Sequence, residues 1–149
     1  MLTFSSESHL DHGLSPDHVV WLLHRFSDRD AFFIETVELP ADYAPLRCAL
    51  HGPLVGGDPV PESEVFYQVR GDRPGRSRGI ARESQETRLV TVIAGPTDDG
   101  SCVIYTAYGG PAAPREPFDP ALEGDALAES EAFWKDHALS IDVFRQKTP

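Results

Sequence analysis

The chain has 149 residues, of which 40% are hydrophobic and 25% are charged, and its formal net charge is −11 at pH 7. This length predicts one domain over residues 1–149 with a single core, and a frayed tail over residues 143–149. No apolar run approaches the roughly 18 residues of a membrane-spanning helix, so no membrane span is expected. The acidity disfavours nucleic acid and anionic membranes as long-range partners, although solubility alone also explains it.

The N-terminus and the cysteines bear on the compartment. The first residues show no basic region followed by an apolar one, so no secretory signal is expected. Cys48 and Cys102 cannot define a disulfide framework, and buried free thiols are the prediction for both. A reducing, cytoplasmic environment is therefore expected.

A short polar turn is predicted near the N-terminus. Ser5 or Ser6 can cap it, His9 and His12 lie within it, and Gly13 is its left-handed terminator.

A second helix is predicted to follow this turn. Ser15 is its N-cap and Pro16 occupies its first position. Surface roles are expected for His18 and His24 on this helix. Its buried stripe is predicted from apolar residues at spacings of three and four: Val19, Val20, Leu22, Leu23 and Phe26.

Runs rich in β-forming residues occupy the middle of the chain. The last two of these runs are joined by the polar stretch "PTDDGS" over residues 96–101, which predicts a hairpin. The predicted strands are "AFFIETVEL" at 31–39, "LRCALHG" at 46–52, "EVFYQVRG" at 64–71, "TRLVTVIAG" at 87–95 and "CVIYTAY" at 102–108.

A last helix is predicted to begin near Pro120, after the proline-rich stretch "GGPAAPREPFDP" at 109–120. The predicted fold class is therefore α+β, with N-terminal helices packed on a mainly antiparallel sheet of about five strands, and a C-terminal helix. One side of the last helix is expected to carry Ser130, Phe133, Trp134, His137 and Ala138.

The arginines are unevenly distributed along the chain. Residues 70–82, "RGDRPGRSRGIAR", place five arginines beside the single acid Asp72. Arginine geometry suits bidentate phosphate binding, and the glycines of this loop would let the backbone approach such a group. The alternatives are a cluster of salt bridges and a solvated loop. The stretch has no Walker-type lysine, so a nucleotide P-loop is not supported.

The pair His9 and His12 lies three residues apart, close enough to share one face of a helical turn. One of them could act as a general acid or base near neutral pH. A metal site is not expected, because Cys48 and Cys102 form no short-spaced ligand motif with them. The alternative is that both histidines are solvated in a polar first turn.

Strict alternation along residues 102–108 separates two faces of the last strand. Thr106 and Tyr108 would lie with Ile104 on one face, opposite a face with Val103, Tyr105 and Ala107. The hydroxyl-bearing face is either one wall of an active site or a polar outer side of the sheet.

Two of these stretches resemble a known group of proteins. "SSESHLDHGLSPDHVVWLL" resembles the opening of small toxin domains such as BrnT-type toxins, in which a polar helix precedes a G-[IL]-S-x-x-x-V helix. "TRLVTVIAGPTDDGSCVIYTAYGG" resembles the closing strands of barnase-like and EndoU-like toxins, whose last strand often ends in T-A-Y. Together they resemble the barnase–EndoU–colicin–RelE group of ribonucleases over about residues 3–27 and 64–110.

The resemblance implies a ribonuclease that needs no metal and no other cofactor, with RNA as substrate and a cognate antitoxin or immunity protein as a further partner. In that group a base takes the ribose 2′-hydroxyl proton, cationic groups stabilise the transition state, and an acid protonates the leaving 5′-oxygen. His9 or His12 would be the acid or base, and Arg78 would hold the phosphate. Thr106 and Tyr108 would position or protonate it. Further substrate contacts are expected from three arginines, Arg70, Arg73 and Arg76.

Two features depart from that group and favour a competing class. Ribonucleases of this kind are usually basic, whereas this chain is acidic, and residues 111–149 have no counterpart in the toxin cores. The alternative is an acidic binding protein, such as an immunity-like partner that neutralises a basic toxin, or a small-anion-binding domain.

Overall fold

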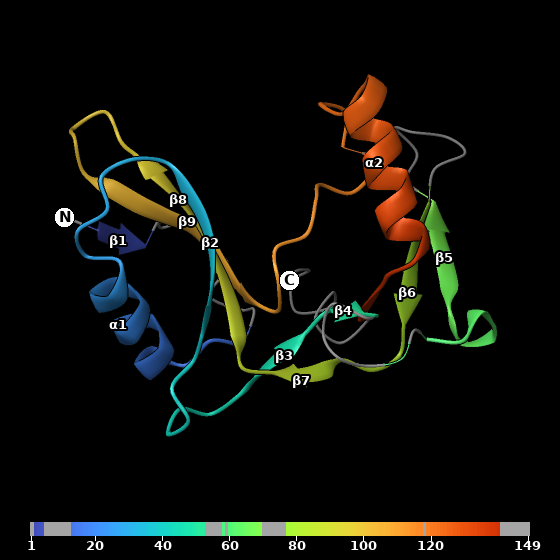
Figure 1. Cartoon of the computed structure of the whole chain (residues 1–149), viewed down its shortest axis with the longest axis horizontal. Coiled ribbons are helices and arrows are strands. Elements are labelled where there is room, and N and C mark those ends of the chain that lie inside the picture. Colours follow the sequence, from blue (N-terminus) through green and yellow to red (C-terminus); the bar gives the residue numbers. More distant parts are fainter. Residues whose placement is uncertain are drawn as a thin grey trace. The chain divides into compact units, whose positions relative to one another are not determined.

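The computed structural model describes residues 2–4, 13–52, 58, 60–69, 77–117 and 119–140, and for residues 67–69, 77 and 78 it describes the backbone (Figure 1). These residues form two compact units. The first unit comprises the described residues up to Arg47 and those of Glu86–Ala112, and the second comprises those of Cys48–Gln85 and those from Ala113 onward. The expectation of one domain over residues 1–149 stays a prediction. Both units contain helix and strand, so the fold is α+β, as predicted.

Helix α1 of the first unit spans Pro16–Arg25 and begins at the predicted N-cap. The Ser15 hydroxyl accepts a hydrogen bond from the backbone N–H of His18 (3.3 Å), and the Nδ1 of His18 accepts one from the backbone N–H of Ser15 (2.9 Å). This is a capping box in which histidine takes the place of the usual Glu or Gln. The Nε2 of His18 then donates to the carbonyl of Ala44 at 2.7 Å. The prediction of a surface role for His18 is wrong, because its side chain is buried and holds the helix start.

The buried face of α1 follows a spacing of four residues, through His18, Leu22 and Phe26. Val20 was expected in the buried stripe, but its side chain is 66% exposed. Two residues along a helix rotate by about 200°, which turns Val20 away from the face of Leu22.

A six-stranded sheet carries the first unit. Five of its strands follow the order β2-β8-β9-β3-β7. The sixth strand, β1, pairs in parallel with residues 102–104 of β9 (Figure 1). The pairs β2–β8 and β8–β9 are antiparallel, and the second of these is the predicted hairpin. The strands are β1 Leu2–Phe4, β2 Phe33–Glu38, β3 Leu46–Cys48, β7 Gln85–Thr87, β8 Leu89–Pro96 and β9 Cys102–Gly109.

One face of this sheet packs on α1 and forms the core of the first unit. The helix contributes Leu22 and Phe26, and strand β8 contributes alternate residues, as expected for a sheet with one buried face. The buried cluster consists of Leu2, Leu22, Phe26, Phe33, Leu39, Leu46, Val90, Val92, Ala94, Cys102, Ile104 and Ala107.

A β-bulge interrupts the alternation along β9. Thr106 pairs with Ile93, but the next pair on β8 joins Ala94 to Ile104, so Tyr105 is an extra residue. The bulge turns Ile104 onto the core face together with Ala107, and both are buried. The prediction that Thr106 and Tyr108 lie opposite Ala107 is confirmed, whereas their grouping with Ile104 and the grouping of Val103 with Ala107 are wrong. Strict alternation fails here because one strand contains one residue more than its partner.

The turn of the β8–β9 hairpin is closed by Thr97 and Ser101, whose backbones are hydrogen bonded at 2.8 Å. Gly100 takes the left-handed conformation that this turn requires, with a φ of 84°. The pKa of Asp99 is held well below its ordinary value, chiefly by the hydroxyl of Ser101 and also by that of Thr97. The turn is therefore stabilised by the charged carboxylate at neutral pH, and this contribution is lost as pH falls through the lowered pKa.

The second unit is built on a four-stranded sheet with the order β4-β10-β6-β5. The pairs β4–β10 and β5–β6 are antiparallel, and β10–β6 is parallel. Its elements are β4 Leu50–His51, the 3-10 helix Glu62–Glu64, β5 Phe66–Val69, β6 Ser77–Ala81, helix α2 Gly124–Lys135 and β10 Ala138–Ser140 (Figure 1).

The predictions for the last helix and for the number of strands need correction. The last helix begins at Gly124 rather than near Pro120, and Ala138 belongs to strand β10 rather than to the helix. The strands are also more numerous than the five expected and form two sheets. Strand β10 is three residues long, which is too short for a periodic pattern to reveal.

The core of the second unit is centred on Trp134 of α2, which is 7% exposed and packs with Cys48 and Leu50. The indole N–H of Trp134 donates to the carbonyls of Pro114 and Arg115, both at 3.3 Å. Apart from Gly109, which ends β9, the described residues of the proline-rich stretch form no helix or strand. Two of its carbonyls, those of Pro114 and Arg115, accept hydrogen bonds from α2 instead.

Candidate functional site

The predicted catalytic histidines, His9 and His12, lie outside the described residues, and so do the predicted substrate-binding arginines Arg70, Arg73 and Arg76. The backbone of Arg78 is described in strand β6, where it pairs with Gln68.

Thr106 and Tyr108 are the members of the predicted constellation whose side chains are described. Both are half-buried on the face of β9 turned away from the α1 core. On the same face, the hydroxyls of Thr36 and Thr91 are hydrogen bonded at 2.8 Å, and Thr91 donates to the carbonyl of Gly110 at 2.7 Å. The Thr91 hydroxyl thus holds the chain where it leaves β9, which is a structural role.

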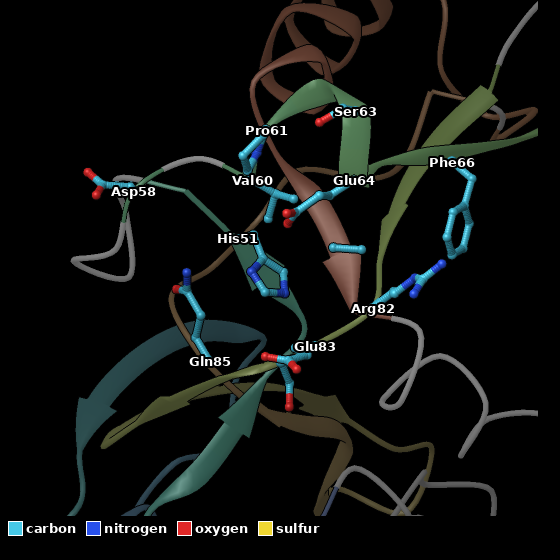
Figure 2. A pocket seen from close by; sticks show the side chains of 12 residues that line it. His51, Asp58, Val60, Pro61, Ser63, Glu64, Phe66, Arg82, Glu83 and Gln85 are labelled. Atoms are coloured by element: carbon cyan, nitrogen blue, oxygen red, sulfur yellow. The ribbon is translucent and has the colours of Figure 1, made fainter.

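A cavity of about 880 Å³ lies within the second unit (Figure 2). Three segments form it: strand β4, the stretch that leads through the 3-10 helix into β5, and the chain that leaves β6. It is lined by His51, Asp58, Val60, Pro61, Ser63, Glu64, Phe66, Ala81, Arg82, Glu83, Ser84 and Gln85.

The floor of the cavity belongs to the four-stranded sheet. Leu50 packs with Trp134 on one face of the sheet, and alternation turns His51 to the other face, where it lines the cavity with 6% exposure. Ser140 pairs with Ala81, another lining residue, and paired residues project to the same face. The floor is therefore built from β4 and the end of β6, two strands that β10 joins in one sheet.

Acidic side chains dominate the charge of the cavity. Asp58, Glu64 and Glu83 contribute three carboxylates, and Arg82 contributes one guanidinium. Figure 2 shows Glu64 pointing toward the imidazole of His51, with Glu83 on the other side of that ring and Asp58 pointing away from both. The ion pairs of the described residues lie elsewhere, between Arg29 and Glu35 and between Arg115 and Asp119.

Two buried hydrogen-bonding atoms near the cavity have no partner among the described residues, the Oε1 atom of Gln85 and the hydroxyl of Ser140. A buried acceptor without a partner costs free energy, commonly about 1–3 kcal/mol. Neither atom is exposed to the cavity, so the acceptors that the cavity offers to a ligand include its carboxylates but neither of these two atoms.

The described residues contain no group of three or more His, Cys, Asp or Glu side chains placed to hold a metal ion. Cys48 and Cys102 are free and buried, as predicted, and burial raises the pKa of the Cys48 thiol. Such a thiol is a poor nucleophile, because the thiolate is the reactive form.

Sequence reasoning missed this cavity. In the sequence, His51 stands at the end of a predicted strand with no partner motif, and the acidic residues that precede β5 and follow β6 match no motif either. Of the arginine-rich stretch over residues 70–82, Arg82 lines this cavity, near the end of the β5–β6 hairpin at which Phe66 pairs with Ile80.

No family model, curated protein or solved structure matches the chain. Within the part of the chain that the structure describes, no helix has the length and apolar character to cross a membrane.

Proposed function

We propose that this protein is a binding protein, and that the cavity of its second unit receives a cationic group. The observation that carries the proposal is the arrangement of Glu64 and Glu83 on either side of the buried His51, with neither carboxylate in an ion pair between described residues (Figure 2). Carboxylates accept hydrogen bonds, and bonds to ammonium or guanidinium groups are among the stronger ones.

The size and charge of the cavity support this choice over a phosphate ligand. Its volume of about 880 Å³ falls within the range usual for small-molecule sites. Three carboxylates against one guanidinium give a negative lining, which attracts cations and repels phosphate at short range. The net charge of −11 adds a long-range attraction of the same sign for a cationic ligand or a basic partner.

The proposal is tested with agmatine, a guanidinium cation that has no carboxylate. We expect it to shift the amide NMR signals of residues around the cavity, with binding that weakens as salt increases. The double variant Glu64→Gln, Glu83→Gln should bind agmatine about tenfold or more weakly, because hydrogen bonds to charged groups are lost.

Glu129→Gln is the matched control, since it removes an exposed carboxylate of the same unit on α2 and should leave binding unchanged. Absence of signal changes around the cavity at millimolar agmatine would refute the proposal.

Metal-independent cleavage of RNA is the alternative function, and it rests on the resemblance to toxin ribonucleases. Purified protein incubated with total RNA and EDTA decides between the two. We expect the RNA to remain intact.

A ribonuclease would instead cleave the RNA, and His9→Ala, His12→Ala or Arg78→Ala would reduce the rate by about 100-fold or more, as loss of a catalytic acid or base does. Cleavage that these variants abolish would replace the binding proposal.

A further inference from the structure

We infer that the ligand of the cavity is a small zwitterion, with a guanidinium group at Glu64 and Glu83 and a carboxylate at Arg82. The inference rests on the proposed function and adds the chemical class of the ligand. It follows from two features of the lining that a simple cation does not use, Arg82 and Phe66.

Arg82 places a positive charge in an otherwise acidic lining. It follows strand β6 directly, its side chain is exposed, and it forms neither of the ion pairs between described residues. In Figure 2 its guanidinium extends toward Phe66, whereas Glu64 points toward His51. A guanidinium binds a carboxylate with two parallel hydrogen bonds, so this part of the cavity suits an anionic group of the ligand.

Phe66 adds a large apolar ring to the lining, in addition to the smaller apolar residues Val60, Pro61 and Ala81. Its ring is 42% exposed at the start of β5, although large apolar side chains are usually buried. Because it lies beside Arg82 in the lining, it can cover the hydrocarbon part of a ligand whose charged ends are bound separately (Figure 2).

The two carboxylates decide which kind of cation fits. Glu64 and Glu83 offer oxygen atoms that can only accept hydrogen bonds when they are charged. They therefore call for a cation that carries several N–H donors. A guanidinium group meets this requirement, whereas a quaternary ammonium has no donor to offer.

L-Arginine and agmatine form the matched pair for the test, because they differ in the carboxylate alone. Calorimetric titration of the full chain should show L-arginine binding about tenfold or more tightly than agmatine, since the added bond joins two charged groups. In Arg82→Gln the preference for L-arginine should be lost. Lys135→Gln removes an exposed positive charge from α2 of the same unit and should keep the preference for L-arginine.

The outcomes separate this inference from the proposed function. Equal binding of both ligands to the parent chain would overturn the zwitterion and leave the cationic site in place. A preference for L-arginine that survives in Arg82→Gln would overturn the role of Arg82. Failure of both ligands to bind would remove the proposed function and the inference together. Circular dichroism establishes that the variant is folded, and the comparison on the parent chain does not depend on it.

Discussion

Replacement of Trp134 by alanine is expected to lower the free energy of unfolding by about 3–5 kcal/mol, the usual cost of truncating a buried aromatic residue. The indole is 7% exposed, packs against Cys48 and Leu50, and donates to the carbonyls of Pro114 and Arg115. Its loss leaves a void in a small core and removes the donor that those carbonyls share. Total stabilities are only about 5–15 kcal/mol, so the variant would be close to unfolding.

Urea unfolding followed by circular dichroism measures this loss. Phe32→Ala is the control, because Phe32 is 62% exposed and its truncation should change stability by less than about 0.5 kcal/mol. A loss below about 1 kcal/mol in Trp134→Ala would contradict the packing described for the second unit.

The same variant tests the prediction of a single domain. The chain has two tryptophans, and Trp21 lies in the first unit, where it packs beside Tyr43 at a centroid distance of 6.0 Å. In Trp134→Ala, the fluorescence of Trp21 reports the first unit alone. If the chain is one cooperative domain, the Trp21 transition must shift with the circular dichroism signal. A Trp21 transition that remains where the parent has it would establish two domains.

The elements marked by local chemistry could be predicted from the sequence. Ser15 and Pro16 predicted the start of α1, and the polar stretch over residues 96–101 predicted the β8–β9 hairpin. Caps and short turns depend on residues that are neighbours along the chain, so their signals are present in the sequence itself. The burial of Cys48 and Cys102 was predictable for a similar reason, since both sit among apolar, β-forming residues.

The features that depend on pairing between distant segments could not be predicted. The bulge at Tyr105 arises from the register of β9 against β8, and no single residue in the sequence indicates it. Strand β10 is three residues long, yet it joins β4 to β6 and so brings His51 into the same sheet as Ala81. Without β10, nothing in the sequence connects His51 with Arg82 and Glu83. The candidate site was therefore missed because the strand that assembles it was missed.

The second large effect is expected at Gly109, near the end of β9. A Cβ atom at this position would come within 2.8 Å of the carbonyl oxygen of Arg47 and 2.9 Å of the Cβ of Leu46. Both contacts involve the chain of β3 rather than the end of a flexible side chain, so the backbone itself would have to move.

Gly109→Val should therefore lower stability by about 3 kcal/mol, at the upper end of the cost of overpacking a core. Valine is otherwise favoured in strands, so β propensity cannot account for a loss. Gly95 provides the matched control on the paired strand β8, because a Cβ there would meet the hydroxyl of Tyr105 at 2.7 Å. The Tyr105 side chain is 43% exposed and can rotate away, so Gly95→Val should cost less than about 1 kcal/mol. Chemical denaturation of both variants measures the difference, and equal losses at the two glycines would show that the close approach of β3 to β9 does not constrain this sheet.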